Sequence, residues 1–171
     1  MTATGSPDHL AAAAVSALRA RGWTLATAES LTAGLLAATV AEVPGASDVL
    51  RGGLVVYATD LKHRLADVPE DVLNRHGAVS AETARALAVG AARRCGADVG
   101  IGLTGVAGPD LQEGQPVGTV HVGVSAPGVD PWSIRVSLTG DRGAIRRGAC
   151  TTALELLLGI VVDDDGNESG T

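Results

Sequence analysis

Apolar residues recur along the chain with two spacings, one typical of helices and the other typical of strands. The helical spacing predicts helices over 9–22, 35–43, 69–77, 80–96 and 142–162, and leaves 61–68 ambiguous. Apolar runs bounded by glycine, proline or polar residues predict strands over 24–28, 52–58, 97–105, 119–127 and 132–140. Helices and strands alternate in the first two-thirds, and a short turn over 127–131 joins the last two strands as an antiparallel hairpin. We therefore predict an α/β protein, a three-layer α/β/α sandwich with a mixed sheet.

The two ends of the chain set the expected limits of this domain. Asp8 is suited to cap the first helix and Gly22 to end it. Small polar residues over 1–7 and acidic residues over 163–171 are typical of flexible tails. A chain of 171 residues has the length of one domain. We predict a single domain over 8–162.

Composition narrows the range of partners. Aromatic residues make up 2% of the chain and Phe is absent, so Ala, Val and Leu must fill the core. A net charge of −6 argues against general binding of nucleic acid. No apolar run approaches the roughly 20 residues of a membrane span or resembles a signal peptide, so we expect a cytoplasmic protein with no membrane partner. Cys95 and Cys150 have no second ligand at metal-binding spacing, and we expect reduced packing cysteines and no metal.

Polar residues follow three of the predicted strands directly. They are Glu29 and Ser30, the segment from Tyr57 to Lys62, and Thr104 with Gly105. Ligands of open α/β sheets bind beside the carboxyl ends of the strands. We expect these three segments to converge on one site.

Ser30 lies where a predicted strand turns into a helix. The free N–H groups of a first helical turn favour a bound or developing anion, which suits a serine nucleophile. The alternative is that Ser30 or Thr32 simply caps the helix, and the turn lacks the glycines of a nucleophile elbow.

A serine nucleophile needs a base, and the four histidines are poorly placed to supply one. His9 lies in the first helix, His63 and His76 flank short surface elements, and His121 is expected to be a half-exposed strand residue. A structural or solvated role is the more frequent one for such histidines.

Lys62 is the better candidate for the base. A desolvated lysine can lose its proton near neutral pH, and serine–lysine pairs are an established arrangement in acyl transfer. The alternative is a solvated surface lysine beside Asp60. Tyr57, the only tyrosine, either relays a proton or orients the amine, or else is an apolar residue at the end of a strand with a wet hydroxyl.

Six motifs in order give the chain a resemblance to a known family: AESLTAG, GGLVVYATDLK, HGAVSAETARALA, LTGVAGPD, PVGTV and GDRGAIRR. Over about residues 10–158 the sequence resembles the CinA C-terminal domain family, whose stand-alone members are nicotinamide-nucleotide amidohydrolases. The resemblance implies hydrolysis of nicotinamide mononucleotide to nicotinate mononucleotide and ammonia in pyridine nucleotide salvage. It implies no metal and no organic cofactor.

The resemblance also implies roles for individual residues. Ser30 would attack the amide carbon, Lys62 would take its proton, Tyr57 would pass it to ammonia, and Thr104 would help backbone N–H groups to hold the oxyanion. Phosphate binding falls to Arg142 or Arg146, at the start of the last helix, whereas Arg147 is expected to be solvated. Further substrate contacts are expected from Glu29, Thr32, Gly34, Gly105, Ala107 and Gly108.

The sequence departs from the family pattern at several positions, among them Ala33, Thr59, Leu111, Gln112 and Gln115. These changes remove none of the expected catalytic groups, but they leave two alternatives to the amidohydrolase. One is a non-catalytic nucleotide-binding module, and the other is a serine–lysine amidase with a different carboxamide substrate. A homodimer or higher homo-oligomer is a possible assembly.

Overall fold

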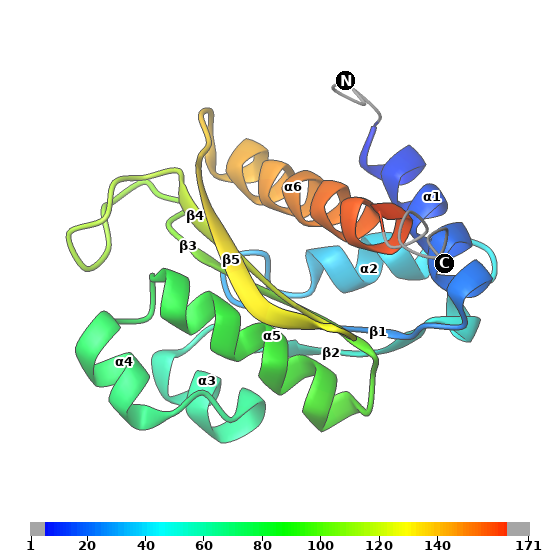
Figure 1. The fold of residues 1–171 in the computed structure, drawn as a ribbon. Helices are drawn as coiled ribbons and strands as arrows, with labels where there is room; N and C mark the ends of the chain where they lie inside the picture. The colour runs from blue at the N-terminus through cyan, green and yellow to red at the C-terminus, as the bar shows by residue number, and fades with distance from the viewer. Residues whose placement is uncertain (1–5, 164–171) are drawn as a thin grey trace.

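The computed structural model describes residues 6–163, and a five-stranded sheet forms its centre (Figure 1). The spatial order is β2-β1-β3-β4-β5. The strands are β1 (Leu25–Glu29), β2 (Leu50–Val55), β3 (Val99–Gly105), β4 (Thr119–Ala126) and β5 (Val129–Ser137). β1 pairs in parallel with β2 and β3, whereas β4 is antiparallel to β3 and β5. The predicted mixed sheet is confirmed.

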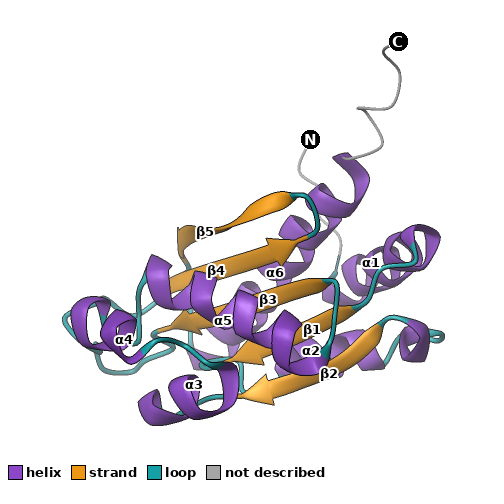
Figure 2. Ribbon diagram, turned by 60° about the horizontal axis from the view of Figure 1, so that its bottom comes forward, coloured by secondary structure: helices purple, strands orange, loops and turns teal. Residues whose placement is uncertain are grey.

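Helices cover both faces of the sheet (Figures 1 and 2). One layer holds α1 (Pro7–Arg21), α2 (Leu35–Ala41) and α6 (Arg142–Asp163), and the other holds α3 (Thr59–Ala66), α4 (Glu70–His76) and α5 (Ala81–Cys95). A short 3-10 helix, η1 (Ala46–Asp48), precedes β2. This is the predicted three-layer α/β/α arrangement. Within residues 6–163, no helix combines the length and apolar character that crossing a membrane requires.

The two layers pack on the sheet in different ways. On the side of α1 and α6, the core is built from Leu, Ile and Val side chains such as Leu18, Ile101 and Leu154. On the other side, α5 lies so close to the sheet that a Cβ at Gly102 or Gly123 would overlap the carbonyl oxygen of Ala84. Glycine on these strands therefore lets the backbone of α5 lie on the sheet, which fixes the start of that helix.

Several helices and strands begin or end at other residues than the sequence predicts. Ser6, and not Asp8, caps α1, because its Oγ accepts from the His9 N–H at 3.5 Å. β5 begins at Val129, so the hairpin turn is shorter than the predicted 127–131. The ambiguous segment 61–68 lies mostly in α3. The predicted tails fall largely outside the described residues, although Pro7 and Asp163 belong to α1 and α6.

Burial was also mispredicted at two places in the sheet. The apolar run over 52–58 suggested a buried strand, but β2 alternates between half-buried and exposed residues because it is an edge strand. His121 was expected to be half exposed and is only 7% exposed, since it lies on a central strand. Cys95 and Cys150 are free and lie in α5 and α6, and burial raises the pKa of Cys150 to about 12.

Candidate active site

The turn from β1 to α2 presents Ser30 at the carboxyl edge of the sheet. The Ser30 N–H donates to the Leu103 carbonyl at 2.9 Å, which extends the pairing of β1 with β3 by one residue. The chain then reverses through Ala33 and Gly34, whose φ angles of 48° and 93° are left-handed. Ser30 is 8% exposed. This turn holds the hydroxyl at a fixed place where the sheet ends.

Glu29, the last residue of β1, stabilises this turn. Its carboxylate accepts hydrogen bonds from the N–H groups of Leu36 at 2.8 Å and Ala37 at 3.0 Å, and from the Thr27 hydroxyl at 2.9 Å. A carboxylate at the N-terminus of α2 satisfies N–H groups that have no partner inside the helix. Glu29 is fully buried in this role. It binds the start of α2 and not, as expected from the sequence, the substrate cavity.

Lys62, from the first turns of α3, reaches back to Ser30. Its Nζ lies 3.0 Å from the Ser30 Oγ, and it donates to the carbonyl oxygens of Val56 at 2.9 Å and Tyr57 at 3.3 Å. Its exposed fraction is 1%. Burial lowers the pKa of Lys62 to about 8, against the opposing effect of the negative charge of Glu113. The surface lysine considered from the sequence is therefore excluded.

The three neighbours of the amine give it an orientation. A neutral amine has two N–H bonds and one lone pair, and carbonyl oxygens only accept hydrogen bonds. When the two carbonyls of Val56 and Tyr57 take both N–H bonds, the lone pair is left for the hydroxyl proton of Ser30. This is the geometry that a general base for serine requires.

A cavity of about 140 Å³ opens beside Ser30. Three segments that follow strands supply its walls, together with the first residue of α6. Its lining residues are Ser30, Leu31, Tyr57, Gly105, Val106, Ala107, Gly108, Asp110, Gln112 and Arg142. The expected convergence of three strand ends is thus observed, and six of the predicted site residues line the cavity, whereas Lys62 lies behind Ser30.

Arg142 and Tyr57 form the mouth of this cavity. The Arg142 guanidinium donates to the Tyr57 hydroxyl at 2.8 Å and to the Gly108 carbonyl at 2.6 Å. Tyr57 is 55% exposed. Its backbone carbonyl, and not its hydroxyl, contacts the Lys62 amine, and its hydroxyl accepts from Arg142.

Arg146 lies one helical turn further along α6 and has a different task. Its guanidinium donates to the carbonyl oxygens of Leu31 and Thr32, both at 2.9 Å. Arg146 therefore braces the serine turn and does not line the cavity. Of the two arginines expected at the phosphate, only Arg142 borders the cavity.

Two predicted hydroxyl contacts are also placed elsewhere. The Thr104 hydroxyl donates to the Ala78 carbonyl at 2.6 Å and is absent from the cavity lining, so it holds the turn before α5 and not an oxyanion. The Thr32 hydroxyl is buried and has no hydrogen-bond partner among the described residues. The N–H groups of Leu31, Thr32 and Gly34 have no acceptor within residues 6–163, and of these three residues only Leu31 lines the cavity.

The sequence interpretation assigned no site role to Asp110, Gln112 or Glu113. Asp110 and Gln112 line the cavity, and Glu113 binds the turn before α5. It also missed a simple signal for Lys62, which is the only lysine in a chain whose other twelve basic residues (Lys and Arg) are arginines. Arginine keeps its proton in proteins and lysine can lose it, so a single lysine among arginines points to chemistry.

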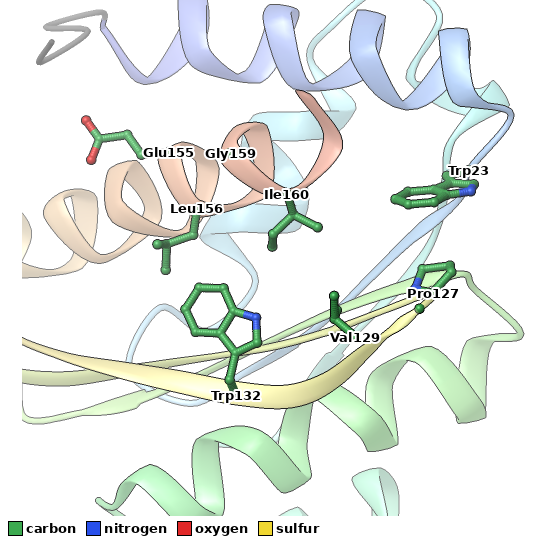
Figure 3. A pocket seen from close by; sticks show the side chains of 9 residues that line it. Trp23, Pro127, Val129, Trp132, Glu155, Leu156, Gly159 and Ile160 are labelled. Carbon is green, nitrogen blue, oxygen red and sulfur yellow. The ribbon is translucent and has the colours of Figure 1, made fainter. Parts of the chain in front are cut away.

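A second, larger cavity differs from the serine cavity in the residues that line it. It has a volume of about 480 Å³, and both tryptophans of the chain, Trp23 and Trp132, face it between α6 and the β4–β5 turn (Figure 3). Among the nine residues that line it, only Glu155 ionises. It offers one carboxylate and no serine–lysine pair, so the smaller cavity is the candidate active site.

Fold and site together define a three-layer α/β/α domain with a buried serine–lysine pair at the carboxyl edge of its sheet. Residues 7–161 match the family described as CinA C-terminal domain. The chain belongs to this family.

Relatives with known sequences and structures agree with this assignment. The chain is 47% identical over 154 residues to a CinA-like protein of Frankia casuarinae and 48% identical over 151 residues to one of Myxococcus xanthus. These matches cover 90% and 88% of this chain but only 35% and 36% of the relatives, so the chain spans about a third of their length. A crystal structure of a competence-damaged protein (CinA) superfamily protein from Klebsiella pneumoniae is 31% identical, with a TM-score of 0.89 over 93% of this chain and 99% of that one.

Proposed function

We propose that the protein is an amidohydrolase that hydrolyses the carboxamide of nicotinamide mononucleotide, with Ser30 as nucleophile and Lys62 as general base. The observation that carries the proposal is the 3.0 Å contact between Lys62 Nζ and Ser30 Oγ, together with the two carbonyls that occupy the N–H bonds of the amine. The resemblance to stand-alone family members that are nicotinamide-nucleotide amidohydrolases supports the choice of substrate.

The reaction begins with attack of Ser30 Oγ on the amide carbon. Lys62 takes the hydroxyl proton, and the C=O electrons move onto the oxygen to give a tetrahedral oxyanion. The free N–H group of Leu31, which lines the cavity, stabilises this charge, and one such donor is typically worth about 3 kcal/mol. The C–N bond then breaks, the Lys62 ammonium returns its proton to the leaving nitrogen, and ammonia departs.

The product of the first half is an ester between Ser30 and the nicotinoyl group. Neutral Lys62 next takes a proton from water, which attacks the ester carbon. The C–O bond to Ser30 breaks, the serine regains its proton from Lys62, and nicotinate mononucleotide leaves. Lys62 and Ser30 end the cycle in their starting protonation states, and water is the only co-substrate that the two steps consume.

Arg142 is the proposed phosphate ligand. Its guanidinium has five N–H donors, and the contacts to Tyr57 and Gly108 use only part of them. A guanidinium at the mouth of a cavity suits a phosphate that lies outside it. The cavity volume of about 140 Å³ is smaller than the roughly 300 Å³ of small ligand pockets, which supports a pose with the ring inside and the phosphate at the mouth.

Release of ammonia from nicotinamide mononucleotide tests this proposal. The wild type is expected to release ammonia and form nicotinate mononucleotide in equal amounts, and Ser30→Ala is expected to do neither. Binding of the nucleotide without turnover by the wild type would favour a nucleotide-binding module. Turnover of other carboxamides in place of this one would keep the chemistry and change the substrate. The biological role we propose is pyridine nucleotide salvage in the cytoplasm.

A further inference from the structure

The loop between β3 and β4, residues 106–118, forms one wall of the serine cavity. It contributes Val106, Ala107, Gly108, Asp110 and Gln112 to the lining. Its base is closed by hydrogen bonds from the Val106 N–H to Thr119 at 2.9 Å and from the Gly118 N–H to Val106 at 2.8 Å. Its tip is closed on itself by the bridge between Gln112 and Gln115. The loop therefore projects as a hairpin-like arm (Figure 1).

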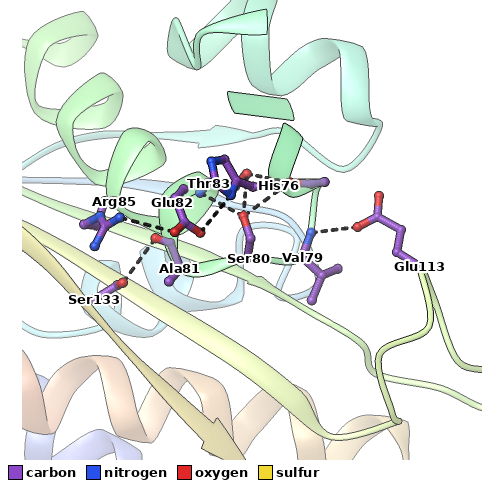
Figure 4. A network of polar contacts seen from close by, with 10 residues as sticks. His76, Val79, Ser80, Ala81, Glu82, Thr83, Arg85, Glu113 and Ser133 are labelled. Carbon is purple, nitrogen blue, oxygen red and sulfur yellow. Dashed lines mark hydrogen bonds and ion pairs between the residues drawn. The ribbon is translucent and has the colours of Figure 1, made fainter. Parts of the chain in front are cut away.

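Glu113, at the tip of this arm, binds the turn before α5. Its two carboxylate oxygens accept from the N–H groups of Ala78 and Val79, each at 3.1 Å, and Figure 4 shows the contact to Val79. A Cβ at Gly77 would lie 2.6 Å from a Glu113 oxygen, so the absence of a side chain at Gly77 makes room for the carboxylate. The exposed Glu113 side chain thus makes two hydrogen bonds to backbone N–H groups of residues 77–79. We call this turn the seat of Glu113.

The seat is itself held from the other side. The Ala78 carbonyl accepts from the Thr104 hydroxyl at the end of β3, and the Gly77 carbonyl accepts from the Thr83 hydroxyl in α5, both at 2.6 Å. Ser80 caps α5 by accepting from the Thr83 N–H at 3.1 Å (Figure 4). The N–H groups of the turn face Glu113 while its carbonyls are bound to the sheet and to α5. Glu113 therefore connects the tip of the arm to the turn before α5.

We propose that Glu113 is a positioning residue of the serine–lysine site, which holds the 106–118 arm in place as a cavity wall and supplies a negative charge near Lys62. The catalytic meaning of this role rests on the proposed function. The two effects share one cause, because the seat that fixes the arm also fixes the carboxylate. Glu113→Ala would free the arm from the turn and also remove the charge. Glu113→Gln would remove the charge but keep one oxygen that accepts from the turn.

The charge of Glu113 acts on Lys62 in a known direction. A nearby anion favours the ammonium form and raises the pKa of Lys62, in opposition to burial, which lowers it to about 8. Burial is the larger effect. Two further charged side chains line the cavity, Asp110 and Arg142, and Arg142 is bound to Tyr57 and Gly108 at the mouth. Removal of the Glu113 charge should therefore lower the pKa of Lys62 further and extend its basic form to lower pH.

The single lysine of the chain allows a direct measurement of this effect. Protein grown with lysine labelled at the ε-carbon gives one lysine side-chain NMR signal, that of Lys62, and its titration reports the Lys62 pKa without any substrate. Glu113→Gln is expected to lower the titration midpoint by about half a unit or more. Glu155→Gln, in the tryptophan cavity, is the matched control and is expected to leave the midpoint unchanged.

Hydrogen exchange tests the mechanical part. In Glu113→Ala, the amides of Ala78 and Val79 are expected to exchange at least about tenfold faster than in the wild type, while amides in β3 keep their protection. Unchanged exchange at these two amides, or an unchanged Lys62 midpoint in a folded Glu113→Gln, would overturn the proposal. Neither readout uses nicotinamide mononucleotide, so failure of the proposed function would not be mistaken for failure of this one.

Discussion

Two cavities of this domain, the tryptophan cavity and the serine cavity, differ in size and in the chemistry of their linings. The tryptophan cavity is larger, about 480 Å³ against about 140 Å³, and its lining is almost wholly apolar. The serine cavity is small, but the ends of three strands and the start of α6 line it, and the one lysine of the chain contacts its Ser30. Volume alone would favour the tryptophan cavity. Convergence of polar groups at the carboxyl edge of the sheet favours the region that holds the serine–lysine pair.

The largest expected effect at the serine cavity is that of Ser30→Ala. Removal of the nucleophile should lower kcat for nicotinamide mononucleotide by at least about a thousandfold, because no covalent intermediate can form. Measurement of ammonia release, with nucleotide binding as the control for folding, checks this. Activity within tenfold of the wild type would show that the cavity does not work through Ser30.

Lys62→Met comes next, with an expected loss in kcat of about 100- to 10,000-fold and little loss of nucleotide binding. Methionine fills a similar volume at a position that is 1% exposed, and so separates loss of the base from loss of packing. Lys62→Arg is the matched variant, because arginine keeps a charge that it cannot release. Equal loss of binding and turnover in Lys62→Met would instead assign Lys62 to the phosphate.

The pH dependence of the wild type follows from the same residue. Lys62 acts as a base only without its extra proton, and burial sets its pKa at about 8. The value of kcat/KM should therefore rise as pH increases through about 8 and fall as pH decreases below it. Steady-state assays between pH 6 and 9 measure this acidic limb, and its midpoint is expected within about one pH unit of 8. A limb that is unchanged in Lys62→Met would contradict the assignment.

The two arginines of α6 provide a sharper and smaller test. Arg142→Ala should raise KM by about 10- to 100-fold with little change in kcat, because the phosphate loses a charged partner. Arg146→Ala should instead lower the free energy of unfolding by about 1–3 kcal/mol, because the carbonyls of Leu31 and Thr32 lose their donor. Steady-state kinetics and urea denaturation of both variants distinguish the roles. A pure kcat defect in Arg142→Ala would contradict phosphate binding.

The smallest expected effect on turnover is that of Trp132→Ala in the larger cavity. We expect kcat and KM to stay within about twofold of the wild type, and the free energy of unfolding to fall by about 2 kcal/mol through loss of apolar contact. Assays and urea denaturation on the same preparation measure both. A loss of activity without a loss of stability would give the tryptophan cavity a part in the reaction.

The sequence predicted the fold well because periodicity reports burial directly. The spacing of apolar residues identified β1, β3 and α5, and the alternation of elements indicated the mixed sheet. It failed for β2, since an apolar run does not reveal whether a strand lies at the edge or the centre of the sheet. Position in the sheet depends on pairing with distant segments, which no local pattern contains.

The candidate site was predicted in its outline and not in its details. Strand ends indicated Ser30 and Lys62, and the family resemblance indicated Arg142. Glu29, Thr104 and Arg146 were expected at the substrate, whereas in the structure each binds backbone groups. Direction of a side chain depends on three-dimensional packing. Glu113 was missed because its partners lie 34 and 35 positions away in the sequence.

Detection of the acyl-enzyme is the most direct test of the central claim, that Lys62 activates Ser30 as a nucleophile. Wild-type protein mixed with nicotinamide mononucleotide, quenched with acid within one turnover and digested, can be examined by mass spectrometry. The account predicts a nicotinate mononucleotide adduct on the peptide that contains Ser30, and its absence in Ser30→Ala and Lys62→Met. Release of ammonia with no adduct at any time, or with an adduct on another residue, would contradict it.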